Sequence, residues 1–365
     1  MGDDVVLVIV VATALAFDFT NGFHDTANVV ATSISTKAMR PRIAVAYAAI
    51  LNFVGAFISL EVAATVAEDV VEAGAVTPTV VFAGLIGAIA WNLITWYFGL
   101  PSSSSHALIG GVVGSTIAAV GTGAVLVDGV VGEVLIPAVI APIVAFLVGA
   151  LAILAAYRIV GRLRPGPVTR GFRLGQTITG GLLALAHGTN DAQKTMGVIT
   201  LALVANGTLS EDAGVPFWVV VSAATAIAFG TYSGGWRIIR TMGTRIIKMD
   251  AAQGFSAQGA GSAVILSSTY FGFPLSTTQV IAGGVMGAGA GKRVSAVRWG
   301  VAGNIVTAWL LTLPASAAMG AVAYGLTRIF GTGAVGPVVV AVAAVALIAT
   351  IFARRARQGA PVPAG

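Results

Sequence analysis

Cysteine is absent from this chain of 365 residues, and histidine occurs only three times. The lack of cysteine excludes disulfide bonds, thiolate nucleophiles and zinc sites built on thiolates. We expect no cofactor and no structural metal.

Charged residues are also scarce. They make up 9% of the chain, whereas 57% of the residues are hydrophobic and the mean hydropathy is +0.93. A soluble domain of this length has about a quarter charged residues. Apolar runs recur at 4–17, 43–60, 78–98, 134–157, 215–230 and 335–353. We predict an all-α polytopic membrane protein with about 10–12 embedded helical segments, whose first apolar run is a retained helix and not a signal peptide.

Positive charge is missing from the stretches 61–77, 121–133 and 204–216. Basic residues gather instead at 37–42, 158–173, 237–248, 292–298 and 354–357, and Arg328 alone does not fit this pattern. Because basic short loops stay in the cytoplasm, the pattern places the N-terminus outside and the C-terminus inside the plasma membrane. The net charge of +6 therefore reflects topology in a lipid bilayer and indicates no nucleic-acid partner.

The two halves of the chain resemble each other. YFGLPSSSSHALIGGVVG (97–114) and YFGFPLSTTQVIAGGVMG (270–287) are identical at nine of eighteen positions, and NGFHDTAN (21–28) aligns with HGTNDAQK (187–194). The charge pattern orients the two copies oppositely. We therefore predict an inverted-topology repeat with broken helices and hairpins, which is typical of secondary transporters. Its predicted parts are a first transmembrane repeat (1–157), a cytoplasmic basic connection (158–173), a second, inverted transmembrane repeat (174–353) and a basic C-terminal tail (354–365).

A few ionisable residues fall inside apolar sequence, where each costs several kcal/mol unless it is paired or hydrated. They are Asp18, Asp25, Asp191 and Lys194, accompanied by His24, His106 and His187. Helical spacing puts the polar side chains of 18–28 on one face, and those of 187–194 on one face of a second helix. Such groups suit a small cation or a proton; the alternative is an Asp–Lys pair that only holds helices together. Gly22 and Gly188 precede the aspartates, where we expect the helices to unwind.

Hydroxyl residues follow a proline in both copies of the hairpin motif. They are Ser102, Ser103, Ser104 and Ser105 after Pro101, and Ser276, Thr277 and Thr278 after Pro274. This order indicates a turn followed by a helix start, where free N–H groups and the positive end of the helix dipole favour an oxyanion. The alternative is that the hydroxyls only satisfy the backbone of a tight hairpin.

The balance of charge inside the membrane narrows the mechanism. Three aspartates accompany a single lysine, and no arginine lies in the apolar core. A multivalent anion that enters such a site has to bring positive charge with it, as Na⁺, H⁺ or a bound divalent metal. The sequence therefore predicts symport of an oxyanion with a cation.

At these residues the chain resembles the inorganic phosphate transporter (PiT) family. The resemblance rests on NGFHDTANVVAT (21–32), HGTNDAQKTMG (187–197), PSSSSHALIGG (101–111) and PLSTTQVIAGG (274–284), in a region from residue 10 to residue 310. It implies cation-coupled phosphate uptake, no enzymatic activity, a phosphate site and a coupling-cation site. The implied phosphate ligands are Ser103, Ser104, Ser105, Ser276, Thr277 and Thr278, and the implied cation ligands are Asp25, Asn28, Asn190 and Asp191. To His24, His187, Lys194, Gln193 and Asp18 we assign proton or accessory roles.

His24 stands where many members of that family have asparagine. The histidine form is similar to bacterial low-affinity members that move neutral metal–phosphate complexes with protons, which favours H⁺ over Na⁺ and a divalent metal such as Mg²⁺ carried with phosphate. Three alternatives stay open: a transporter of another oxyanion such as sulfate, an intramembrane serine hydrolase with Ser104 or Ser105 beside His106, and a passive ion channel. The sequence leaves the oligomeric state open and is compatible with a homodimer.

Overall fold

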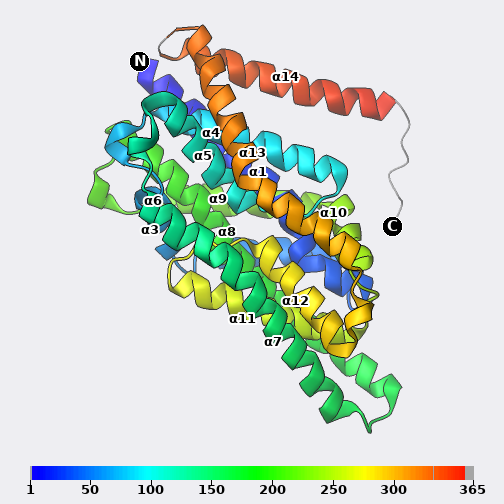
Figure 1. Ribbon diagram of the computed structural model, residues 1–365. Coiled ribbons are helices and arrows are strands. Elements are labelled where there is room, and N and C mark those ends of the chain that lie inside the picture. The colour runs from blue at the N-terminus through cyan, green and yellow to red at the C-terminus, as the bar shows by residue number, and fades with distance from the viewer. Residues whose placement is uncertain (1, 332, 358–365) are drawn as a thin grey trace.

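The computed structural model describes residues 2–331 and 333–357, which form a helical assembly (Figure 1). Its α-helices are α1 (Gly2–Ser35), α2 (Pro41–Gly55), α3 (Glu61–Glu68), α4 (Pro78–Phe98), α5 (Ser104–Val120), α6 (Val127–Gly129), α7 (Ile136–Val160), α8 (Pro165–Ala205), α9 (Phe217–Ser233), α10 (Trp236–Arg240), α11 (Ala251–Tyr270), α12 (Thr277–Lys292), α13 (Trp299–Ile329) and α14 (Val335–Arg357). A π-helical segment, Val130–Leu135, joins α6 to α7, and another, Thr241–Arg245, extends α10. The prediction of an all-α fold is confirmed.

Several of these helices are long and apolar enough to cross a membrane. Within the described residues, length and composition identify four such spans, in α1, α4, α6–α7 and α13. The pair of α9 and the extended α10, bent by 59°, adds a fifth if it is one span, and α2, α5 and α14 contain shorter apolar helices. The chain is therefore an integral membrane protein, while the larger total of embedded segments stays a prediction.

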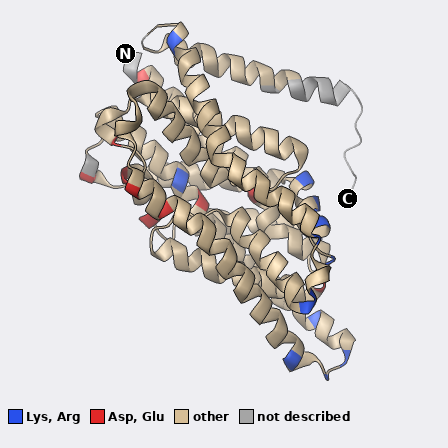
Figure 2. Cartoon of the chain, in the orientation of Figure 1, with Lys and Arg blue, Asp and Glu red and all other residues tan. Residues whose placement is uncertain are grey.

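Charged residues separate along the molecule. Figure 2 shows most lysines and arginines toward the lower right and most aspartates and glutamates toward the left. This separation agrees with the predicted arrangement, in which basic loops lie at one end of the molecule and loops without basic residues lie at the other. Which end faces the cytoplasm stays a prediction. The basic segment 158–173 is mostly helical, because α7 ends at Val160 and α8 begins at Pro165. Of the predicted tail, 354–357 belongs to α14 and 358–365 lies outside the described residues.

The two halves of the chain pack against each other reciprocally. In the first half α1 packs on α9, and in the second half α8 packs on α2. In the same way α5 packs on α13 while α12 packs on α7, and Figure 1 shows α12 and α7 side by side. Equivalent helices thus have equivalent partners, as two-fold-related repeats require. The inverted orientation of the repeats in a bilayer stays a prediction.

The expected unwinding at Gly22 and Gly188 is wrong, because α1 and α8 run through both glycines without a break. The two glycines permit close helix packing instead. A Cβ atom built on Gly22 would lie 2.4 Å from the Ile227 carbonyl oxygen of α9. At Gly188 it would lie 2.1 Å from the Asn52 carbonyl oxygen of α2. Only glycine lets the backbones approach so closely.

The chain breaks instead at the two YFGxP motifs. Helix α4 ends at Phe98 and α11 at Tyr270, and the glycines that follow, Gly99 and Gly272, have φ values of 65° and 78°. This left-handed conformation favours glycine and turns the chain sharply at a helix end. The chain then passes through the proline segment into α5 or α12. The predicted hairpins and helix starts are therefore confirmed.

Candidate functional site

Two buried carboxylates lie where the N-terminal ends of α5 and α12 meet the unbroken helices α1 and α8. Asp25 on α1 accepts a hydrogen bond from the Ser104 hydroxyl at 2.7 Å. Asp191 on α8 accepts one from the Thr277 hydroxyl at 3.3 Å. All four residues are almost fully buried. Each half of the chain thus joins its own carboxylate to the first turn of its own hairpin helix.

Further contacts cross from one half to the other and make a single site. The Thr278 hydroxyl of α12 donates to Asp25 at 3.3 Å, and the side-chain amide of Asn28 donates to Thr278 at 2.9 Å. In the opposite direction, Lys194 of α8 donates to the Ser105 hydroxyl of α5 at 2.6 Å. Ser105 and Thr278 occupy equivalent places in the two hairpins, as do Asn28 and Lys194 in the two long helices. The predicted residues of both halves therefore converge.

Lys194 is the fixed cation of this cluster. Its ammonium group lies 2.5 Å from an Asp191 oxygen and also donates to the Leu275 carbonyl oxygen at 2.7 Å. These two contacts and the Ser105 contact engage all three of its N–H donors. Lys194 therefore neutralises Asp191 but has no donor left for Asp25.

The basic side chain beside Asp25 is His24. Nδ1 of His24 lies 2.6 Å from an Asp25 oxygen, and Nε2 lies 3.1 Å from the Thr95 hydroxyl of α4. Asn190, at the equivalent position of the second half, donates to the Thr269 hydroxyl of α11 at 2.9 Å. The two residues thus make comparable contacts, but only the histidine has a side chain that can take up a proton.

Several polar atoms of the cluster have no hydrogen-bond partner. They include the side-chain oxygens of Asn28 and Asn190 and both ring nitrogens of His187. Nε2 of His187 lies 3.0 Å from an Asp191 oxygen, without the alignment of a hydrogen bond. One ligand atom each from Asp25, His187 and Asp191 lie within 4.8 Å of one another. Unpaired buried polar atoms are costly, and the unpaired amide oxygens together with the carboxylates fit a positively charged ligand.

Three of the predicted site residues cap helices. Ser103 accepts a hydrogen bond from the His106 backbone N–H at 3.1 Å, and Ser276 accepts one from the Gln279 N–H at 3.3 Å. Both serines are therefore N-caps of the hairpin helices. The Gln193 side chain accepts from the Val62 and Ala63 N–H groups at the start of α3, at 2.8 and 3.2 Å, and caps that helix.

Sequence reasoning missed the two threonines that hold His24 and Asn190. Thr95 lies two residues before the first YFGxP motif and Thr269 one residue before the second, and this nearness of a threonine to each motif is the signal that could have identified them. The Leu275 carbonyl, which accepts from Lys194, carries no such signal because every residue has a carbonyl. Asp18 is buried on α1, but it makes no hydrogen bond with the cluster.

The geometry does not favour a serine hydrolase built on His106. Ser104 donates to Asp25, and Ser105 donates to the Leu275 carbonyl oxygen at 3.0 Å. The His106 ring faces the Gln279 amide at 3.4 Å. A serine nucleophile requires a hydrogen bond to the histidine base, and neither of these serines makes that contact with His106.

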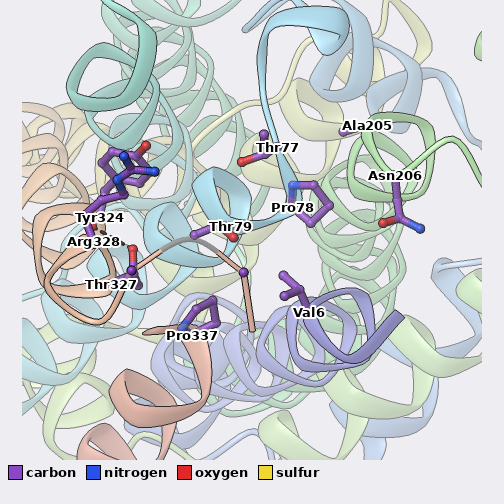
Figure 3. A pocket seen from close by; sticks show the side chains of 12 residues that line it. Val6, Thr77, Pro78, Thr79, Ala205, Asn206, Tyr324, Thr327, Arg328 and Pro337 are labelled. Carbon is purple, nitrogen blue, oxygen red and sulfur yellow. Dashed lines mark hydrogen bonds between the residues drawn. The ribbon is translucent and has the colours of Figure 1, made fainter. Parts of the chain in front are cut away.

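A cavity of about 430 Å³ lies far from this cluster, between the N-terminal ends of α1 and α4 and the C-terminal ends of α8 and α13 (Figure 3). Its lining includes Val6, nineteen residues before Asp25 on the continuous helix α1. At 1.5 Å per residue the two lie roughly 28 Å apart along that helix. Arg328, the basic residue that departs from the charge pattern, lines this cavity and not the carboxylate cluster.

The fold and this cluster define a class of protein: a helical membrane protein whose two related halves share one buried polar site, as in secondary transporters. The sequence profile of the phosphate transporter family matches residues 21–320. The chain belongs to this family, and the predicted family resemblance is confirmed.

Several relatives are described as probable low-affinity inorganic phosphate transporters. One from Mycobacterium tuberculosis is 56% identical over 89% of this chain and 78% of its own length. One from Bacillus subtilis is 44% identical over 88% of this chain and 96% of its own length. The fold is similar to that of a solved sodium-dependent phosphate transporter, with a TM-score of 0.79, 24% identity and coverage of 89% of this chain and 99% of that chain.

Proposed function

We propose that this protein imports inorganic phosphate by symport with protons. The observation that carries the proposal is the meeting of two helix N-termini, one from each half, beside two buried carboxylates. Each N-terminus offers free backbone N–H groups, a positive dipole end and first-turn hydroxyls, which together suit an oxyanion. We assign phosphate to the hydroxyls of Ser104, Thr277 and Thr278, which contact the carboxylates, and to that of Ser105, which contacts Lys194.

Charge balance supports the coupling to a cation. Asp25 and Asp191 together outnumber the single ammonium of Lys194, so a phosphate dianion would meet excess negative charge in a site with little water. A proton on His24 would offset part of this charge beside Asp25. A divalent metal carried with phosphate would offset more, and the ligand atoms of Asp25, His187 and Asp191 lie close enough together to bind one.

Sulfate is the nearest rival substrate, because it has the same tetrahedral shape. Hydrogen phosphate can donate its own proton to Asp25 or Asp191, whereas sulfate has no proton to donate. An anionic carboxylate can therefore accept a hydrogen bond from the first ligand, whereas it only repels the second. We expect excess unlabelled phosphate to suppress uptake of labelled phosphate, and excess sulfate to leave it unchanged.

Reconstitution of the purified full chain in liposomes tests the proposal directly. We expect an inward pH gradient to drive accumulation of ³²P-phosphate above equilibrium, with stimulation by Mg²⁺, and a Na⁺ gradient alone to drive none. Accumulation that requires Na⁺ would show that the coupling ion is Na⁺ and not H⁺. Entry that stops at equilibrium under every gradient would instead identify a passive channel.

Removal of two facing hydroxyls should weaken phosphate binding. In the double variant Ser104→Ala/Thr277→Ala, phosphate loses two hydroxyl partners while the capping serines stay in place. Because hydrogen bonds to charged groups contribute about 1.5–3 kcal/mol each, we expect the KM for phosphate to rise roughly tenfold or more. Initial uptake rates in proteoliposomes give the KM, and Ser233→Ala, which removes an exposed hydroxyl from α9, is the control. An unchanged KM would reduce both hydroxyls to a structural role in the turns.

Replacement of His24 by asparagine should flatten the pH dependence of uptake. Asparagine fits there, since Asn190 makes the comparable contact with Thr269 in the second half. It cannot take up a proton, so the part of the pH dependence that comes from His24 should disappear. His106→Gln is the control, because glutamine occupies the equivalent position 279. A His24→Asn variant with the wild-type pH profile would exclude His24 as the titrating group.

A further inference from the structure

Asp18 is a fully buried carboxyl group without a partner. Its exposed fraction is 0%, and neither side-chain oxygen makes a hydrogen bond. The side chains of Asn21 on α1 and Thr195 on α8 lie beside it, but neither reaches it with hydrogen-bond geometry. The Asn21 side-chain oxygen and the Thr195 hydroxyl are unpaired as well. Four buried oxygens on two packed helices thus lack a donor.

The fixed charges around Asp18 do not neutralise it. Asp191 and Lys194 of α8 lie within electrostatic range, and they are already paired with each other. Helices α4 and α9, which also pack on α1, contain no charged residue, and α14 contains none from 335 to 353. The arginines of α10 and its extension lie along the part of α1 that follows Asp18. Gly235 and Gly243 pack there on the Phe23 and Ala31 carbonyl oxygens. The titratable groups His24, Asp25 and His187 contact other members of the central cluster.

A single added proton would complete this set of oxygens. A protonated Asp18 gains one O–H donor, and rotation of the side chains would let it donate to the Asn21 oxygen and accept from the Thr195 hydroxyl. An ionised Asp18 leaves an uncompensated charge in an apolar interior, which is among the most costly arrangements in a protein. A sodium ion would find only these four oxygens from three side chains, and the helix neighbours Ala14 and Phe17 belong to the hydrophobic core.

We infer that Asp18, with Asn21 and Thr195, forms a proton-binding site separate from the phosphate site, and that its proton is carried with phosphate. This inference rests on the proposed phosphate symport. Asp18 lies seven residues before Asp25, roughly 10 Å along the helix. Protonation removes a negative charge that repels Asp191 and competes for Lys194, and so favours entry of an anion. Loss of the proton on the other side of the membrane reverses this effect.

The test compares exchange with accumulation in proteoliposomes that contain the full chain. Asp18→Asn keeps the shape of a protonated carboxyl but never releases a proton. We expect it to exchange ³²P-phosphate without a gradient, to lose at least about tenfold of its pH-driven accumulation, and to carry about one proton fewer per phosphate. A pH-sensitive dye in the lumen reports the protons. The control is Asp128→Asn, which removes an exposed carboxylate.

A second variant keeps the carboxyl group and alters only its neighbour. Thr195→Val removes the hydroxyl that can stabilise the ionised form of Asp18. Phosphate accumulation should therefore remain coupled to protons, but the pH at which it is half-maximal should be higher than in wild type.

Four results would overturn the inference: normal accumulation by Asp18→Asn, loss of exchange by a folded Asp18→Asn protein, a pH midpoint of Thr195→Val equal to that of wild type, or Na⁺-driven accumulation that depends on Asp18. A wild-type protein that does not exchange phosphate would contradict the proposed function itself.

Discussion

Replacement of Asp25 by asparagine is expected to abolish concentrative phosphate uptake while the protein remains in the membrane. Asparagine has nearly the same shape and can still accept the Ser104 hydrogen bond, so the fold has little reason to change. It removes the negative charge that pairs with His24 and that we expect to attract the coupled cation. If the free energy that couples cation binding to phosphate binding is near the upper end of the usual range, its loss corresponds to a roughly 100-fold lower uptake.

The measurement is pH-driven uptake of ³²P-phosphate, normalised to the amount of protein in the membrane fraction. Asp191→Asn is the matched variant of the second half and should show a loss of similar size. Glu133→Gln, which replaces an acidic residue outside the cluster, should transport normally. Normal uptake by both aspartate variants would refute the cation site.

Replacement of Lys194 by methionine should be the most destabilising of these changes. Methionine fills similar space, but Asp191 is then left fully buried without its cation, which costs about 3–5 kcal/mol. Lys292 provides the control, because it also contacts a carboxylate, Asp250, at 2.9 Å. The lysine side chain of that pair is 50% exposed, and such pairs contribute at most about 1 kcal/mol. Thermal unfolding in detergent should therefore show a much lower Tm for Lys194→Met than for Lys292→Met.

The double variant Asp191→Asn/Lys194→Met separates stability from transport. With both charges removed, no unpaired charge is buried, so much of the lost stability should return while uptake stays absent. Equal Tm values for the two single lysine variants would show that the Lys194 pair is no more important to the fold than a surface pair.

The sequence was sufficient to predict the residues that meet at the site, for reasons that particular positions make clear. Asp25 and Asp191 interrupt apolar runs, and a charge at such a place needs a partner or a function. The YFGxP motifs predicted the hairpins because glycine and proline restrict the backbone in recognisable ways. These signals are local, and they survive without knowledge of the tertiary structure.

Other parts of the site depend on geometry that the sequence does not encode locally. Whether Ser103 or Ser104 faces Asp25 depends on the residue at which α5 begins, and a shift of one residue exchanges their roles. The contact of Gln193 with the start of α3 joins segments 130 residues apart. Gly22 and Gly188 looked like points of flexibility because glycine permits both bending and close packing, and only the neighbouring helices distinguish the two.

The reciprocal packing of the hairpins has a consequence for how the protein can move. Helix α5 is held by α13, which belongs to the other half, and α12 is held by α7 in the same exchanged way. If α5 and α12 move when the protein alternates access to the two sides of the membrane, each would therefore move with a helix of the opposite half. Close glycine contacts hold these pairs, because a Cβ atom built on Gly114 of α5 would lie 2.0 Å from the Ala317 carbonyl oxygen of α13, and one built on Gly287 of α12 would lie 2.0 Å from the Phe146 carbonyl oxygen of α7. We therefore expect α5 to move together with α13, and α12 together with α7, during transport.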